Sequence, residues 1–77
     1  MNFKELRQFI GYEKGEPQTQ RDMMVMVGRG DNDSGVSWSN WETGRHEADT
    51  DSLKLIAKAF NVIVTITPDG EISFDRE

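Results

Sequence analysis

The segment SWSNWETGRHEADTDSLKLIAKAFNV, from Ser37 to Val62, constrains the fold more than any other part of the chain. A short polar stretch carries Trp38 and Trp41, and a glycine follows that can end a helix. Further on, apolar side chains recur three and four residues apart, which is the spacing of one buried helix face. The recurring residues are Leu53, Ile56, Ala57 and Phe60. The sequence therefore predicts two helices, over about residues 34–43 and 51–60, with an N-cap at Asp49 or Thr50.

The length of 77 residues and the absence of cysteine limit what the chain can be. A chain of this size buries only about 60% of its unfolded surface, and no disulfide can brace it, so we expect self-association to add stability. The first residues lack the apolar core of a signal peptide. The longest apolar runs fall far short of the ~20 residues that cross a bilayer. We therefore expect a cytoplasmic protein.

Two further helices and a hairpin are predicted on either side of this segment. Phe3, Leu6 and Ile10 share one helix face over residues 3–13, with Asn2 as N-cap. A second helix is expected from Thr19, a good cap residue, to Gly28. The sequence thus predicts a mainly α fold, a bundle of four to five short helices with a C-terminal β-hairpin.

The hairpin is predicted where the apolar pattern changes to period two after Asn61. Residues 62–66 are rich in β-branched side chains, a Thr-Pro-Asp-Gly turn follows, and residues 71–74 return. The first strand is apolar on both faces, and a lone hairpin is marginal in water. We expect residues 1–61 to form the helical domain and 62–77 to be a possible dimerisation element. The expected dimer contacts are Val62, Val64, Ile66, Ile72 and Phe74.

Several motifs together resemble one known family. Thr19-Gln20 matches the opening of its second helix, and Trp41-Glu42-Thr43-Gly44 matches the end of its third. The downstream run of apolar residues from Leu53 fits as well. Over about residues 3–62 the chain resembles the phage-repressor (Cro/XRE-type) helix-turn-helix DNA-binding family. The resemblance implies a lambda-repressor-like fold and a sequence-specific transcriptional regulator, a repressor of phage or mobile-element type, acting as a homodimer on a palindromic operator.

The resemblance also implies which side chains contact double-stranded DNA. Gln20 would contact the backbone, with three arginines positioning the protein on phosphates. Exposed polar residues of the third helix would face the major groove, where asparagine can pair with an adenine edge. The implied DNA-binding residues are Gln20, Arg21, Arg29, Ser34, Ser37, Asn40, Thr43 and Arg45.

Three features depart from the family pattern. Met24 stands where the family has alanine and should push helices two and three apart unless a neighbour is smaller. The interval from Gly28 to Trp41 is about four residues longer than usual. The third helix has neither lysine nor arginine.

The charge distribution leaves a second hypothesis open. The chain carries a net charge of −5, and residues 31–51 hold six acids against Arg45 alone. Phosphate contacts supply much of DNA affinity, so such a segment is unusual in a DNA-binding protein. The alternative is a helix-turn-helix-derived protein that binds a basic protein partner, as an antirepressor or an anti-CRISPR-type inhibitor. His46 has no second histidine or cysteine to share a metal, so neither an enzyme nor a cofactor is expected. We expect the tryptophans to pack in the core.

Overall fold

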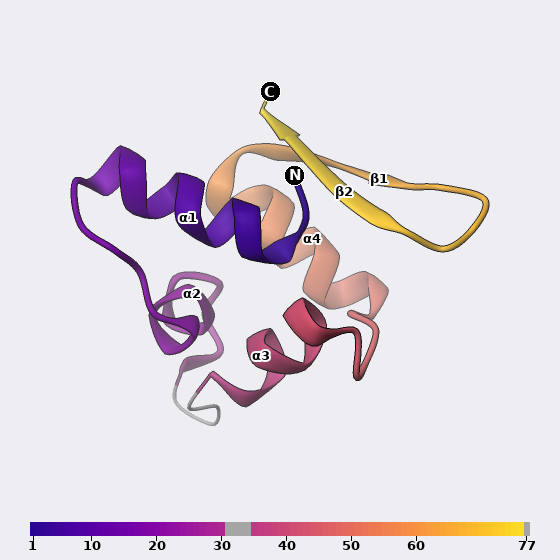
Figure 1. Ribbon diagram of the computed structural model, residues 1–77, viewed down its shortest axis with the longest axis horizontal. Coiled ribbons are helices and arrows are strands. Elements are labelled where there is room, and N and C mark those ends of the chain that lie inside the picture. Colours follow the sequence, from indigo (N-terminus) through magenta and orange to yellow (C-terminus); the bar gives the residue numbers. More distant parts are fainter. Residues whose placement is uncertain (31–34, 77) are drawn as a thin grey trace.

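The computed structural model describes residues 1–30 and 35–76. Four helices are followed by a two-stranded antiparallel hairpin (Figure 1). The elements are α1 (Phe3–Lys14), α2 (Gln20–Met26), α3 (Val36–Thr43), α4 (Thr50–Phe60), β1 (Val62–Ile66) and β2 (Ile72–Arg76). The prediction of a mainly α fold with a C-terminal hairpin is confirmed. None of the helices in this part of the chain is both long and apolar enough to span a membrane.

Three of the helices begin at the cap residues that the sequence predicts. Asn2 Oδ1 accepts a hydrogen bond from the backbone N–H of Glu5 at 2.8 Å, and the Glu5 carboxylate accepts one from the Asn2 N–H at 3.0 Å. Thr19 and Asp22 form the same reciprocal pair at the start of α2. Asp49 caps α4 by accepting from the backbone N–H three residues later at 3.1 Å. Each cap satisfies backbone donors that the first turn leaves unpaired.

Two helix boundaries differ from the prediction by more than one residue. The third helix was expected from about residue 34, but α3 begins at Val36 because Gly35, with φ 98°, lies outside the helical region. Helix α2 ends at Met26, and Gly28 follows with φ 88°. Asn61, with φ 54°, ends α4 as predicted.

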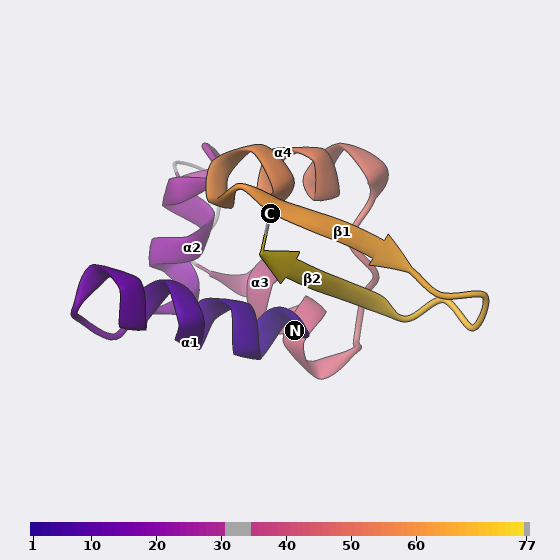
Figure 2. The ribbon, with the colours of Figure 1, turned by 90° about the horizontal axis from the view of Figure 1, so that it is seen from above.

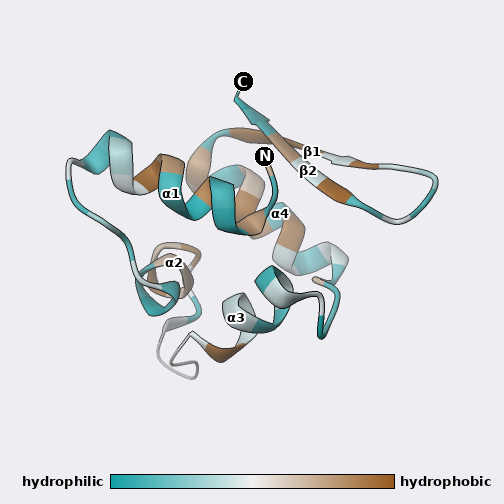
Figure 3. Ribbon diagram, in the orientation of Figure 1, coloured by the Kyte–Doolittle hydropathy of each residue, from teal (hydrophilic) through white to brown (hydrophobic). Residues whose placement is uncertain are grey.

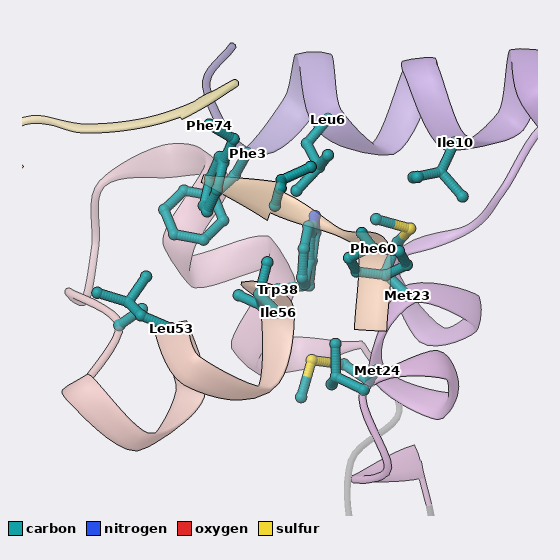
Figure 4. Close-up of a cluster of buried hydrophobic side chains, with 13 residues drawn as sticks. Phe3, Leu6, Ile10, Met23, Met24, Trp38, Leu53, Ile56, Phe60 and Phe74 are labelled. Carbon is teal, nitrogen blue, oxygen red and sulfur yellow. The ribbon is translucent and has the colours of Figure 1, made fainter. Parts of the chain in front are cut away.

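Trp38 lies at the centre of the hydrophobic core (Figure 4). The other completely buried large side chains are Leu6, Met23, Met24, Ile56 and Phe74. Phe3 packs edge-on against Trp38, with ring centroids 5.5 Å apart. Trp41, half-buried, packs against Trp38 at the same distance. The expectation that both tryptophans pack in the core is confirmed, fully for Trp38 and in part for Trp41.

The hairpin covers the helices on the side opposite α3 (Figure 1). Seen from above, it runs between α4 and α1, with β1 next to α4 and β2 next to α1 (Figure 2). Its register pairs Val62 with Arg76 at one end and Ile66 with Ile72 at the other. The turn projects beyond the helices in both views.

This placement corrects part of the predicted dimer surface. Phe74 is completely buried and Val62 is 5% exposed, both in the same core as the helices. The backbone N–H of Phe74 also donates to the Met1 carbonyl at 2.7 Å. Because these two side chains are covered by the chain itself, they are not available to a second copy. The predicted contacts that stay accessible are Val64, Ile66 and Ile72.

Candidate nucleic-acid interface

A glycine allows α2 and α3 to lie close together. A Cβ atom on Gly35 would lie 2.7 Å from the backbone nitrogen of Arg21 and 3.1 Å from the Cβ of Gln20. Met24 is accommodated in the core with 1% of its surface exposed. The effect of Met24 on the separation of the two helices stays a prediction, while the structure shows a close approach of Gly35 to the start of α2.

An open hollow of about 330 Å³ lies where the start of α2 meets the outer face of α3. Its lining residues are Gln20, Gly35, Val36, Ser39, Asn40 and Arg45. Arg45 carries the only charge among these described residues. The lining of this hollow is thus polar with one cation, although the chain as a whole is acidic.

Glu42, the one acidic residue within α3, does not line this hollow. Its side chain is 6% exposed, and both carboxylate oxygens accept hydrogen bonds from Arg7 of α1, from Nε and Nη2, at 3.0 Å. The remaining Arg7 nitrogen, Nη1, donates to the Gln18 carbonyl at 3.0 Å. This two-pronged geometry is the strongest form of an arginine–carboxylate pair. The pair neutralises Glu42 and ties α3 to α1.

The same carboxylate also orients Gln20. The Gln20 amide nitrogen donates to Glu42 Oε2 at 3.2 Å. Because the amide nitrogen is engaged with Glu42, the amide is held in one orientation at the edge of the hollow. The side chain of Gln20 is thereby held in place by α3, the helix that carries Glu42.

Three predicted contact residues come together at the hollow: Gln20, Asn40 and Arg45. The backbone N–H of Arg45 donates to the Asn40 carbonyl at 2.9 Å, which fixes the turn after α3. Gly44 makes this turn possible with φ 75°. Arg45 is exposed beside Asn40 as a result.

Two other predicted residues are engaged elsewhere. Arg29 Nη1 donates to the hydroxyl of Ser52, a buried residue of α4, at 2.5 Å. Arg29 therefore fastens the segment after α2 to α4. The Thr43 hydroxyl donates to the Ser39 carbonyl at 3.0 Å inside α3, and Thr43 does not line the hollow.

The remaining predicted residues occupy different positions. Arg21 is exposed on α2 beside Asp22, and Ser37 is half-buried on α3. Ser34, also predicted as a contact, lies outside the described residues. Three residues that line the hollow, Gly35, Val36 and Ser39, were not predicted as contacts. The signal for Val36 was available, because it precedes Asn40 by four residues and a helix places such pairs on one face.

A second, larger hollow of about 550 Å³ lies between the hairpin turn and the segment after α3. Trp41 and Ile72 contribute apolar walls, and Glu47 and Glu71 contribute exposed carboxylates. This hollow is acidic where the first is cationic. It is suited to a basic rather than an anionic ligand.

Comparisons of the chain with protein-family models, with curated proteins and with solved structures found no match.

Proposed function

We propose that the protein is a small sequence-specific DNA-binding regulator with a lambda-repressor-like fold. It acts as a homodimeric repressor of phage or mobile-element type on a palindromic operator, in the cytoplasm. The observation that carries the proposal is the hollow at α2 and α3. It gathers two amides and one guanidinium, and the nearby carboxylate of Glu42 is neutralised by Arg7.

In this proposal α3 enters the major groove of duplex DNA. Asn40 then faces base edges, where its amide can pair with adenine. Gln20 and Arg45, which line the same hollow, contact phosphates and so fix the register of the protein on the duplex. In a symmetric dimer two such helices would lie about one DNA turn apart, ~34 Å. The accessible apolar residues of the hairpin supply the contact between copies.

The test is a fluorescence-anisotropy titration against the duplex upstream of the protein's own gene, at several salt concentrations. We expect Arg45→Ala and Gln20→Ala each to weaken binding. Arg45→Ala should also lower the slope of log K against log salt by about one, because one phosphate contact is lost. Lys14→Ala, which removes the same charge at the far end of α1, is the matched control and should leave both quantities unchanged. Equal effects at Lys14 and Arg45 would contradict the proposed interface.

A second candidate function is supported by the acidic hollow. There the protein would bind a basic protein partner, as an antirepressor or an anti-CRISPR-type inhibitor, with an arginine or lysine of the partner between Glu47 and Glu71. The expected signature is binding of an arginine-rich peptide that the double variant Glu47→Gln/Glu71→Gln abolishes. That result, together with no salt-dependent duplex binding, would favour this candidate over the repressor.

A further inference from the structure

Val36 is an apolar side chain on an otherwise polar surface. It lies in the first turn of α3 and is 59% exposed. The start of α3 is accordingly coloured as hydrophobic at the outer end of the helix (Figure 3). The other side chains that line the same hollow are amides, a hydroxyl and a guanidinium. An isolated apolar group among hydrogen-bonding groups is suited to a ligand that presents both kinds of group side by side.

The position of Val36 relative to Asn40 limits the kinds of ligand that fit the hollow. The two residues are four apart in α3, so they lie on one face about one turn from each other. Both line the hollow with Gln20 and Arg45. A ligand that contacts the amide of Asn40 is therefore within one helical turn of the Val36 methyls.

The major groove of DNA presents this combination at A·T pairs. Adenine offers an acceptor and a donor to an asparagine amide, and thymine adds a methyl group that makes apolar contacts. Guanine and cytosine offer no methyl group at that edge. The anionic backbone on either side complements the cation at the hollow's edge, which a second copy of this acidic chain would not.

Resting on the proposed function, we propose that Val36 reads a thymine methyl group in the major groove, next to an adenine read by Asn40. The protein therefore selects operators with A·T pairs at the positions under the first turn of α3. Val36 acts as a specificity-determining residue: it contributes affinity only where the 5-methyl group is present.

The experiment removes that methyl group alone. Duplexes are first selected on the wild-type protein from a pool of random sequences. The best duplex is then synthesised with deoxyuridine in place of each thymine in turn, and the dissociation constants are measured at one salt concentration. We expect one or two positions at which deoxyuridine weakens binding about three- to tenfold, as the loss of one buried methyl group implies.

The variants assign this effect to a residue. Val36→Ala should bind the thymine duplex more weakly and show no further loss with deoxyuridine at those positions. The matched control is Val25→Ala, which truncates a valine of similar exposure, 55%, on α2. It should keep the full response to deoxyuridine. Because Val36 is exposed, its truncation should leave the thermal unfolding midpoint unchanged, and circular dichroism checks this.

The outcomes separate the two proposals. Selection of no duplex by the wild-type protein would overturn both. A selected duplex whose deoxyuridine response persists in Val36→Ala would overturn the role of Val36 while the proposed function stands. Loss of self-association in Val36→Ala, with an unchanged deoxyuridine response, would show that Val36 is a contact between copies, and would likewise overturn its role in reading thymine.

Discussion

Gly35 occupies a position where both the backbone conformation and the lack of space disfavour a side chain. Its φ of 98° disfavours any residue with a Cβ atom, and that atom would lie 2.7 Å from the backbone nitrogen of Arg21. We expect Gly35→Ala to lower the free energy of unfolding by more than about 2 kcal/mol, the sum of left-handed strain and a displaced backbone. Urea denaturation followed by circular dichroism measures the loss.

The matched control for this substitution is Gly44→Ala. Gly44 has a similar φ of 75°, but nothing lies within 4 Å of its added Cβ. It should lose only about 1–2 kcal/mol, the cost of the left-handed backbone. An equal loss at both glycines would show that close packing of α2 on α3 does not depend on Gly35.

At the scale of single residues, the sequence located some of the residues that line the hollow but not the helix face that forms it. Asn40 and Arg45 were predicted and lie at the hollow. Ser34, Ser37 and Asn40 are three residues apart in the sequence. In an α-helix each such step rotates the side chain by about 60° relative to the previous one, so the three predicted residues would not share one face. In the structure, the face of α3 that lines the hollow includes Val36 and Asn40. The sequence did not indicate that Val36, at the start of this face, is exposed, because exposure depends on neighbours that the sequence does not give.

Arg29 and Arg7 show a second limit at this scale. Arg29 was expected at phosphates, but Ser52, its partner, is 23 positions away along the chain. Arg7 was not singled out, and its partner Glu42 is 35 positions away. Hydrogen bonds over such separations depend on how the helices pack, so no local pattern predicts them.

Among the secondary-structure elements, α4 has a cap whose strength depends on pH. The hydroxyl and the backbone N–H of Ser52 donate to the exposed carboxylate of Asp49 and hold its pKa below the ordinary value of 3.8. A carboxylate with a lowered folded-state pKa stabilises the fold above its unfolded-state pKa. That contribution disappears as the pH falls through the folded-state value. We therefore expect the cap's contribution to be complete near neutral pH and to fade below about 4.

Asp49→Asn tests this dependence, because asparagine keeps the capping oxygen without the titrating charge. The variant should lose less thermal stability than the wild type between pH 7 and pH 3, measured as the unfolding midpoint by circular dichroism. Asp22, whose pKa is lowered by the backbone N–H and hydroxyl of Thr19, keeps part of the pH dependence. Asp51→Asn removes the same charge from the same turn without affecting the bond to Ser52. It should retain more of the wild-type pH dependence than Asp49→Asn.

The elements themselves were the part most accessible from sequence. Asn2, Thr19 and Asp49 are caps as predicted, because capping depends on residues three positions apart. The change of apolar period after Asn61 likewise located β1. The start of α3 was less accessible, since the conformation of Gly35 depends on its contact with α2.

For the molecule as a whole, the two ends of the hairpin differ in burial: one end packs in the core and the turn end is exposed. Phe74 is completely buried against Phe3, with ring centroids 4.9 Å apart, whereas Ile66 near the turn is 60% exposed. We expect Phe74→Ala to lower the free energy of unfolding by about 3–5 kcal/mol. Ile66→Lys should leave that quantity nearly unchanged and weaken self-association. Sedimentation equilibrium at several protein concentrations measures the second effect.

A change in stability at Ile66 as large as that at Phe74 would place the turn end of the hairpin in the core of the chain. Unaltered self-association in Ile66→Lys would contradict a dimer formed through this end. Thr65→Lys, which adds the same charge at the next exposed position of β1, is the matched control. Its effect on self-association should be smaller, because it replaces no apolar surface.

The division of the hairpin could be predicted only in part. The sequence indicated more apolar surface on β1 than one helix layer covers, and Ile63 and Ile66 are indeed exposed. Which residues are covered depends on where the hairpin crosses α1 and α4. The net charge of −5 was similarly uninformative about the hollow, because Glu42, the acidic residue of α3, is paired with an arginine distant in sequence.

The packing of Trp38 against Trp41 also affects the circular dichroism spectrum of the protein. Their ring centroids lie 5.5 Å apart with the planes inclined by 61°. Electronic transitions of two indoles at this separation and angle couple, and the coupling adds a pair of bands of opposite sign to the ultraviolet dichroism. A helix content calculated from that spectrum would be in error. The same pair of bands would report directly whether the two rings keep their mutual orientation when a ligand occupies the neighbouring surface.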